Sequence, residues 1–187
     1  MIDFSIILAG FGGQGILSAG RIVASAALIE NREVSWFPSY GPEMRGGTAN
    51  CGVVISDEPI GSPIINDTDV LIALNNPSLD KFTKNVKPGG LIIVDSALVY
   101  AIPARKDIRF IPIPASTIAV EMGNVTFATI ILLGSLARAT GCIGRESFEA
   151  ALKEVLPKKK HSMIPDEMKA FDLGWSDEHS VDPGHPL

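Results

Sequence analysis

Short, mainly apolar runs alternate along this chain with longer segments of helical periodicity. The runs are four to six residues long, are bounded by glycine, proline or polar residues, and cover 4–9, 34–37, 51–55, 69–74 and 91–95. Runs of this length and composition are typical of strands that are covered on both faces, as in parallel sheets. A further strand is expected over 109–113, where Pro112 favours an edge position or an early end.

The segments between these runs have the periodicity of helices. They predict helices at 15–29, 77–84, 115–121, 125–139, 145–156 and 158–171, the last of them interrupted near Pro165. Asn76 and Asn124 are expected to be N-caps, and Gly141 is expected to end the long apolar helix. That helix is shorter than the roughly 20 residues needed to cross a bilayer, so it is expected to be buried. The pattern predicts a three-layer α/β/α single domain with a mostly parallel, Rossmann-like sheet.

Composition sets the size and the class of the domain. The 187 residues are 46% hydrophobic and 20% charged, which suits one compact domain, expected over 1–173. Residues 174–187 are rich in Asp, Ser, Gly, Pro and His and are expected to form a polar, flexible tail. The formal net charge is −5 and no long basic stretch exists, so nucleic acid is not an expected partner. The N-terminus lacks the pattern of a secretory signal, which predicts a cytoplasmic protein without a membrane partner.

The residues of this chain give little support to a metal site or to redox chemistry. Cys51 and Cys142 belong to no CxxC or Cys/His pattern, so neither a disulfide framework nor a cysteine-held metal site is expected, and both thiols are predicted to be buried and inert. The three histidines lack the spacing of metal ligands. The Lys-Lys-Lys-His run at 158–161 is either a solvated helix edge or a phosphate-binding one. No residue is assigned a catalytic role, because no Ser/His/Asp series or carboxylate pair stands out.

A first glycine-rich segment follows the run at 4–9 and opens the first helix. Its candidate site residues are Gly10, Gly12, Gly13, Gln14 and Gly15. The pattern exposes backbone N–H groups at a helix N-terminus, which suits an anion. It also matches the dinucleotide fingerprint, but the strand at 34–37 does not end in the acidic residue that holds a ribose, since Glu30 and Glu33 precede it. A nucleotide site, a plain tight turn and a site for another anion or partner all remain open. Gln14 is either solvated or donates and accepts toward a bound group.

A second glycine-rich segment follows the strand at 34–37. Its candidate site residues are Tyr40, Gly41, Pro42, Glu43, Arg45, Gly46 and Gly47. The glycines permit backbone angles closed to other residues, and the proline stiffens the turn. A guanidinium on a rigid loop can bind a carboxylate or phosphate bidentately, so Arg45 is the first residue to test, with Glu43 to orient it. An ordinary surface loop with an ion pair is the simpler alternative.

Together with Pro-Ile-Gly-Ser-Pro at 59–63, the two glycine-rich segments resemble the gamma subunit of 2-oxoacid:ferredoxin oxidoreductases, which use pyruvate, 2-oxoglutarate or ketoisovalerate. The same module is similar to a domain of single-chain pyruvate:ferredoxin oxidoreductase and to a subunit of indolepyruvate oxidoreductase. The resemblance extends from residue 6 to residue 171.

The resemblance implies a multi-subunit complex that oxidatively decarboxylates a 2-oxoacid, passes electrons through iron–sulfur clusters to ferredoxin, and forms acyl-coenzyme A. It implies that thiamine diphosphate, Mg²⁺ and the clusters belong to partner alpha and beta subunits, with a delta subunit as a further candidate. This chain would bind no cofactor by itself and would be inactive alone. The two glycine-rich segments are then expected to face the partner subunits or the coenzyme A entry. The motifs do not encode which 2-oxoacid is used.

Two other functions fit the same residues. A stand-alone nucleotide- or cofactor-binding protein would use the turn at Gly10, and thermal stabilisation by NAD, FAD or coenzyme A would identify it. A purely architectural subunit would contribute no group to the reaction. In that case a complex with both Gln14 and Arg45 replaced would assemble and turn over normally.

Overall fold

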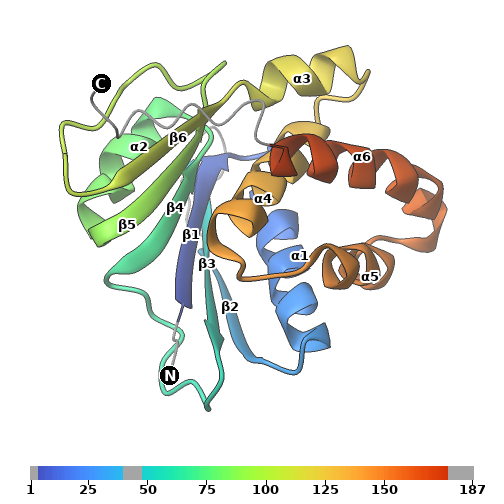
Figure 1. Ribbon diagram of the computed structural model, residues 1–187, viewed down its shortest axis with the longest axis horizontal. Coiled ribbons are helices and arrows are strands. Elements are labelled where there is room, and N and C mark those ends of the chain that lie inside the picture. The colour runs from blue at the N-terminus through green and yellow to red at the C-terminus, as the bar shows by residue number, and fades with distance from the viewer. Residues whose placement is uncertain (1–3, 40–47, 177–187) are drawn as a thin grey trace.

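The computed structural model describes residues 4–39 and 48–176, and Figure 1 shows a twisted sheet with helices on its two faces. The strands are β1 (Phe4–Phe11), β2 (Glu33–Ser39), β3 (Thr48–Ser56), β4 (Thr68–Ala73), β5 (Val86–Asp95) and β6 (Arg109–Ile113). The helices are α1 (Ile16–Ile29), α2 (Asn76–Phe82), α3 (Ala115–Glu121), α4 (Phe127–Thr140), α5 (Arg145–Val155) and α6 (Ile164–Trp175). Two short 3-10 helices are η2 (Thr83–Asn85) and η3 (Lys158–Met163). Every element predicted from the sequence is present, with ends that differ by a few residues.

The strands of the described residues form one sheet in the order β2-β3-β1-β4-β5-β6. The pairs β1–β4, β4–β5 and β5–β6 are parallel, whereas β3 is antiparallel to both of its neighbours, β1 and β2. β3 is therefore the one strand in this part of the chain that runs against the others, so the sheet is mostly parallel, as predicted. Each edge strand contains a proline, Pro38 in β2 and Pro112 in β6, which removes a backbone donor where another chain could pair.

Helices cover the two faces of the sheet unequally (Figure 1). On one face α1 and α4 pack on the strands, with α5 against α1 and α6 against α4. On the other face the short helix α2 packs on β1 and β4 over a smaller core. Alternate residues of β1 face the two cores, since Ile6 and Leu8 belong to the larger one and Ile7 and Ala9 to the smaller one. This is the three-layer α/β/α arrangement that the sequence predicts.

The apolar helix α4 lies at the centre of the larger core. All its residues from Phe127 to Ala137 are buried, because the sheet, α1, α3 and α6 surround it. A helix that is apolar on every side is expected in such a place. Gly141 ends α4 with a φ of +64°, as predicted. Within the described ranges, the structure contains no helix of the length and hydropathy that membrane crossing requires.

Two predicted helix caps lie one or two residues away from their expected places. The N-cap of α2 is Asn75 instead of Asn76, and its Oδ1 accepts a hydrogen bond from Ser78 N at 2.7 Å. The N-cap of α4 is Thr126, and Asn124 Oδ1 accepts from Thr126 N at 3.1 Å. Asn side chains therefore do hold both helix starts, but the sequence did not resolve which of the adjacent polar residues is the cap.

The end of the domain lies beyond the expected boundary at residue 173. Helix α6 continues to Trp175, and Gly174 is buried against α4. The predicted tail therefore starts too early by these residues, because a glycine that sequence analysis assigns to a flexible segment serves here as a helix–helix contact. The rest of the predicted tail, 177–187, lies outside the described residues and stays a prediction.

An ion pair at the amino edge of the sheet, where β1, β4 and β5 begin, makes a pH-dependent contribution to stability. Lys87 Nζ lies 2.9 Å from Asp69 Oδ1, and Ser5 N and Oγ each donate to Asp69 Oδ2 at 2.9 Å. Burial raises the pKa of Asp69, but these donors outweigh burial and hold the pKa below its ordinary value. This stabilisation is present above the unfolded-state pKa of about 3.9 and is lost as the pH falls through the lower folded-state value.

Asp69→Asn is expected to lower the free energy of unfolding by about 1 kcal/mol at neutral pH, because the ion pair and one hydrogen-bond acceptor are lost. The deficit should shrink on acidification, since the wild type loses the same interaction. Urea unfolding at neutral and acidic pH measures both values, with Lys87→Met as a second variant that removes the ion pair from the other side. A deficit that is independent of pH would contradict the electrostatic origin.

Candidate functional site

The chain leaves β1 and β4, two neighbouring parallel strands, toward opposite faces of the sheet. After β1 it crosses to the face covered by α1, and after β4 to the face covered by α2 (Figure 1). Such a switch point leaves a crevice at the carboxyl ends of the two strands, where open α/β sheets bind ligands. Leu74 N donates to Ala9 O at 2.9 Å, so the two strands end side by side. The candidate site is this carboxyl edge of the sheet, at the top in Figure 1.

The turn between β1 and α1 depends on glycine. Gly13 and Gly15 have φ values of +92° and +78°, and Gly15 is the N-cap of α1. A Cβ atom at Gly10 would lie 2.6 Å from Gln14 Oε1 and 2.9 Å from Ile16 Cδ1, so a larger residue there would displace the ends of these two side chains. Gly12 and Gly13 are exposed. The first glycine-rich segment thus forms the predicted tight turn, and its N-cap residue offers no side-chain acceptor to the first amides of the helix.

The Gln14 side chain spans the crevice between the two strands. Its Oε1 accepts a hydrogen bond from Phe11 N at 2.6 Å, and its Nε2 donates a long, weak one to Leu74 O at 3.5 Å. The Gln14 carbonyl oxygen accepts from Thr129 Oγ1 of α4 at 2.6 Å. One residue therefore ties the ends of β1 and β4 to the first turn of α4. In this structure the side-chain amide of Gln14 is hydrogen-bonded to the backbone of its own chain.

A small cavity lies above Gln14. Its volume is about 150 Å³, and its lining residues are Gly13, Gln14, Leu74, Ser116, Val125, Thr126, Ala128 and Thr129. The walls from α3 and α4 were missed by the sequence analysis, which expected the α4 segment to be a buried helix and gave the α3 segment no role. A hydroxyl-rich helix start, Asn124 to Thr129, was the available signal, but its place beside the glycine-rich turn follows only from packing across more than a hundred residues of chain.

Ser116 is held at this cavity by a buried carboxylate. Asp95, the last residue of β5, is fully buried. Its oxygens accept hydrogen bonds from Ser116 N at 3.2 Å, from Ser116 Oγ at 2.5 Å and from Ala97 N at 3.1 Å. The carboxylate therefore fixes both the first turn of α3 and the connection that follows β5, which border the carboxyl edge.

The second glycine-rich segment lies outside the described residues, so the places of Tyr40, Gly41, Pro42, Glu43, Arg45, Gly46 and Gly47 stay predictions. The strand ends on either side of it are described. Ser39, at the end of β2, pairs with Asn50, and Thr48, at the start of β3, pairs with Phe11. The segment therefore leaves from and returns to the same carboxyl edge as the turn that holds Gln14.

The structure also describes the two cysteines and the Lys-Lys-Lys-His run at 158–161. Cys51 and Cys142 are buried, and burial raises the pKa of their thiols to about 12 and about 11, so both are protonated at neutral pH and inert, as predicted. The lysines of 158–160 are exposed, and the His161 ring lies 3.0 Å from Leu156 O. The described part of the chain gathers no group of three His, Cys, Asp or Glu side chains that could hold a metal ion.

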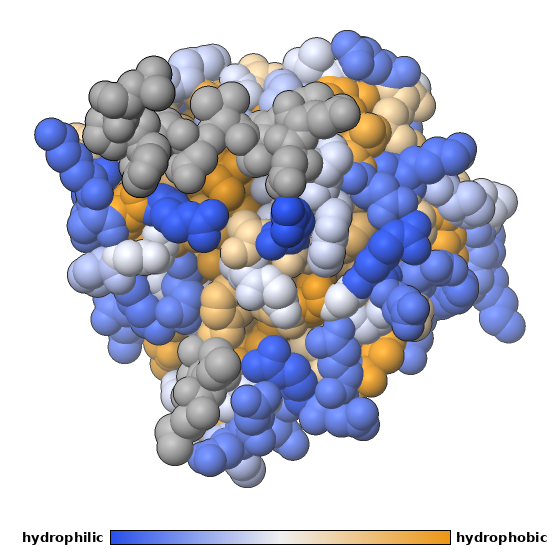
Figure 2. All heavy atoms as spheres, viewed as in Figure 1, coloured by the Kyte–Doolittle hydropathy of each residue, from blue (hydrophilic) through white to orange (hydrophobic). Residues whose placement is uncertain are grey.

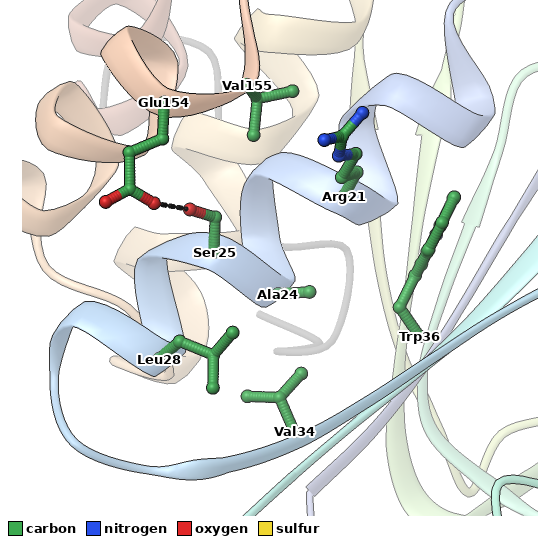
Figure 3. A pocket seen from close by; sticks show the side chains of 8 residues that line it. All are labelled: Arg21, Ala24, Ser25, Leu28, Val34, Trp36, Glu154 and Val155. Atoms are coloured by element: carbon green, nitrogen blue, oxygen red, sulfur yellow. Dashed lines mark hydrogen bonds between the residues drawn. The ribbon is translucent and has the colours of Figure 1, made fainter.

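A larger hollow of about 360 Å³ lies between α1, β2 and α5, along the second half of α1 (Figure 3). Its floor is apolar, formed by side chains such as Leu28, Val34 and Trp36. Two polar side chains on its walls bind each other, because Ser25 Oγ donates to Glu154 Oε2 at 2.7 Å. The indole Nε1 of Trp36, which lines the hollow, is buried without a hydrogen-bond partner. The hollow lies along the second half of α1, away from the switch point at the start of that helix, so it is not part of the candidate site.

The fold defines this protein as a doubly wound α/β domain, whose candidate site is the topological switch point beside a glycine-rich turn. A family model described as pyruvate ferredoxin/flavodoxin oxidoreductase matches residues 5–176. The chain belongs to this family, as the resemblance of its glycine-rich segments indicates.

Known relatives and structures agree with this assignment. The chain is 43% identical over 174 residues to the ketoisovalerate oxidoreductase subunit VorA of Methanothermobacter marburgensis, an alignment that covers 92% of this chain and 36% of the relative. It thus spans little more than a third of that relative's length. Its fold matches the gamma subunit of keto/oxoacid ferredoxin oxidoreductase from Geobacter sulfurreducens with a TM-score of 0.81 and 32% identity, over 94% and 95% of the two chains. It also matches 2-oxoglutarate:ferredoxin oxidoreductase from Magnetococcus marinus, solved with 2-oxoglutarate, coenzyme A and succinyl-CoA, with a TM-score of 0.85 and 26% identity, over 100% and 33%.

Proposed function

We propose that this chain is the gamma subunit of a 2-oxoacid:ferredoxin oxidoreductase, a complex that oxidatively decarboxylates a 2-oxoacid to acyl-coenzyme A and passes the electrons to ferredoxin. The observation that carries the proposal is the match to the Geobacter sulfurreducens gamma subunit over nearly the full length of both chains. The proposal includes alpha and beta partner subunits, with delta a further candidate, and a cytoplasmic location. The substrate is one of the 2-oxoacids that the relatives use.

The chemistry of this chain's own residues fits a subunit without a redox centre. The chain has two cysteines, both buried with protonated thiols, whereas an iron–sulfur cluster is usually held by four cysteine thiolates. The proposal assigns thiamine diphosphate, Mg²⁺ and the clusters to the partner subunits, as the family resemblance implies. The isolated chain should have no activity.

The carboxyl edge is the part of this chain that we assign to the reaction. The cavity above Gln14, of about 150 Å³, is smaller than a typical site for a whole cofactor, so it can take only one group of a molecule such as coenzyme A. A partner subunit or the segment 40–47 would have to complete the site. This favours a role in which the edge shapes the coenzyme A entry or the subunit interface rather than one in which the domain binds a nucleotide alone. β2 ends in Pro38 and Ser39, without the acidic residue that a dinucleotide site requires.

The activity is tested on the complex purified from its source through a tag on this chain. The preparation should contain thiamine-diphosphate and iron–sulfur subunits in fixed stoichiometry. It should reduce ferredoxin with one of pyruvate, 2-oxoglutarate or ketoisovalerate in a reaction that requires coenzyme A. Purification of the chain alone, together with thermal stabilisation of the isolated chain by NAD or FAD, would overturn the proposal in favour of a stand-alone nucleotide-binding protein.

Arg45→Ala in this complex is expected to raise the coenzyme A KM by about tenfold or more, or to weaken assembly to a similar degree, because a guanidinium that binds a phosphate or carboxylate contributes about 1.5–3 kcal/mol. Arg109→Ala, an exposed arginine at the amino edge, is the matched control and should change neither value. Unchanged KM and unchanged assembly in the Arg45 variant would contradict the assigned role of the second glycine-rich segment.

A further inference from the structure

The two edges of the sheet differ sharply in charge. The described connections at the carboxyl edge, 11–15, 74–76, 96–104 and 122–126, contain no charged residue. At the amino edge the connections 30–33 and 105–109 consist mostly of charged residues. Figure 2 shows one face of the molecule, with many hydrophilic residues along its lower rim. Apart from the undescribed segment 40–47, which contains Glu43 and Arg45, the connections at this edge are uncharged, which is unusual for a surface that faces only water, because exposed loops are normally rich in charged side chains.

Large apolar side chains stand exposed on these uncharged connections. Tyr100 and Ile102 are 80% and 79% exposed, and Val125, which lines the cavity above Gln14, is 68% exposed. Phe11 and Leu98 at the same edge are also exposed. They come from three separate connections that the sheet brings to one edge. An exposed apolar group of this kind marks an interaction surface, and aromatic enrichment with charge depletion is characteristic of the centre of a protein interface.

The connection 96–104 holds its apolar side chains in a fixed presentation. Its start is bound to Asp95, whose carbonyl oxygen accepts from Leu98 N at 3.0 Å and whose carboxylate accepts from Ala97 N. Farther along, Asn76 Oδ1 accepts from Tyr100 N at 3.2 Å and from Ala101 N at 3.3 Å. Buried Val99 lies between these two anchors. A partner would therefore meet a prearranged surface, which lowers the entropic cost of association.

We propose that this surface, defined by Phe11, Leu98, Tyr100, Ile102 and Val125 and called the apolar rim, docks an uncharged, apolar face of a partner subunit or domain of the oxidoreductase. This inference rests on the proposed function. In the ketoisovalerate and Magnetococcus marinus relatives the matching module makes up about a third of a longer chain, so further protein is joined to it there. A second copy of this chain is a poorer occupant, because a symmetric contact through this edge would seal two ligand crevices against each other. Docking of a different subunit instead encloses the cavity above Gln14 between the two proteins.

The test uses the complete complex, purified through a tag on this chain from its source. Tyr100→Glu combined with Ile102→Glu places two charges on the rim, and at least tenfold less partner subunit should co-purify. The control combines Leu28→Glu with Ile64→Glu, two exposed apolar residues that lie away from the rim, and should co-purify like the wild type. The thermal midpoint of each isolated variant should equal that of the wild type, because all four side chains are exposed. Hydrogen exchange of the complex should show protection of 96–104 and 122–126 and none of 57–67.

The outcomes separate this inference from the proposed function. If the wild-type chain carries no thiamine-diphosphate subunit with it, the proposed function fails and the inference fails with it. If the wild type carries the subunit and the rim variant retains it equally, only the inference is overturned. If the isolated wild-type chain is a dimer that the rim variant splits, the occupant is a second copy and the assignment to a partner subunit is wrong.

Discussion

Gly174→Ala is expected to lower the free energy of unfolding by about 3 kcal/mol, although alanine is the better helix former. Gly174 of α6 and Gly134 of α4 lie at the closest approach of these two helices. A Cβ atom at Gly174 would overlap the carbonyl oxygen of Ile131, and one at Gly134 would overlap that of Phe171. Both obstacles are backbone atoms, so no side-chain rotation relieves the clash, and the helices have to separate. Urea unfolding followed by circular dichroism measures the change.

The sign of this effect is diagnostic. Helix propensity alone predicts that alanine stabilises an interior helix position by about 1 kcal/mol relative to glycine. Gly134→Ala should be destabilising like Gly174→Ala, and the two together should cost less than the sum of both, because the first separation of the helices relieves the second clash. Gly61→Ala is the control, since a Cβ there meets no atom within 4 Å, and its effect should stay within about 0.5 kcal/mol. Stabilisation by Gly174→Ala would show that α4 and α6 do not pack this closely.

The strands of the sheet were predictable from the sequence, but the direction of one of them was not read from it. The run at 51–55 has the apolar character of a buried strand, and we grouped it with the parallel ones. The connection from β2 to β3 spans only residues 40–47, whereas a parallel neighbour requires a crossover of a dozen or more residues. The length of this loop therefore already indicated that β2 and β3 pair in an antiparallel manner. The apolar composition of a strand indicates that both of its faces are buried, but it does not indicate the direction in which the strand runs.

Sequence analysis could predict only part of the candidate site. Glycines with positive φ, such as Gly13 and Gly15, are recognisable because few other residues adopt that backbone. The contacts of Gln14 with Leu74 and Thr129 cannot be recognised in the sequence, because they depend on how β4 and α4 pack beside the turn. Ser116 escaped notice for the same reason. Local conformation follows from neighbouring residues, whereas a cavity wall is a property of the assembled fold.

Asp95→Ala is expected to lower the free energy of unfolding by about 2 kcal/mol, because it leaves the donors on Ala97 and Ser116 without their acceptor and opens a void where the buried Asp95 side chain stood. Asp95 fixes the starts of α3 and of the connection 96–104, so the variant should also loosen the carboxyl edge. Hydrogen exchange in the surviving folded state should be faster at 96–104 and 115–121, while 57–67 keeps its wild-type rate.

A matched control separates this effect from the loss of any aspartate. Asp57 is exposed and paired with Arg32 at 3.1 Å, and Asp57→Ala should cost less than about 1 kcal/mol. Ser116→Ala removes only the hydroxyl donor and should cost about 1 kcal/mol, and in a double-mutant cycle with Asp95→Ala its cost should fall close to zero, because its acceptor is already gone. Additive costs for the two variants would mean that Asp95 does not hold Ser116, and the cavity above Gln14 would then lack the fixed wall on which its binding role depends.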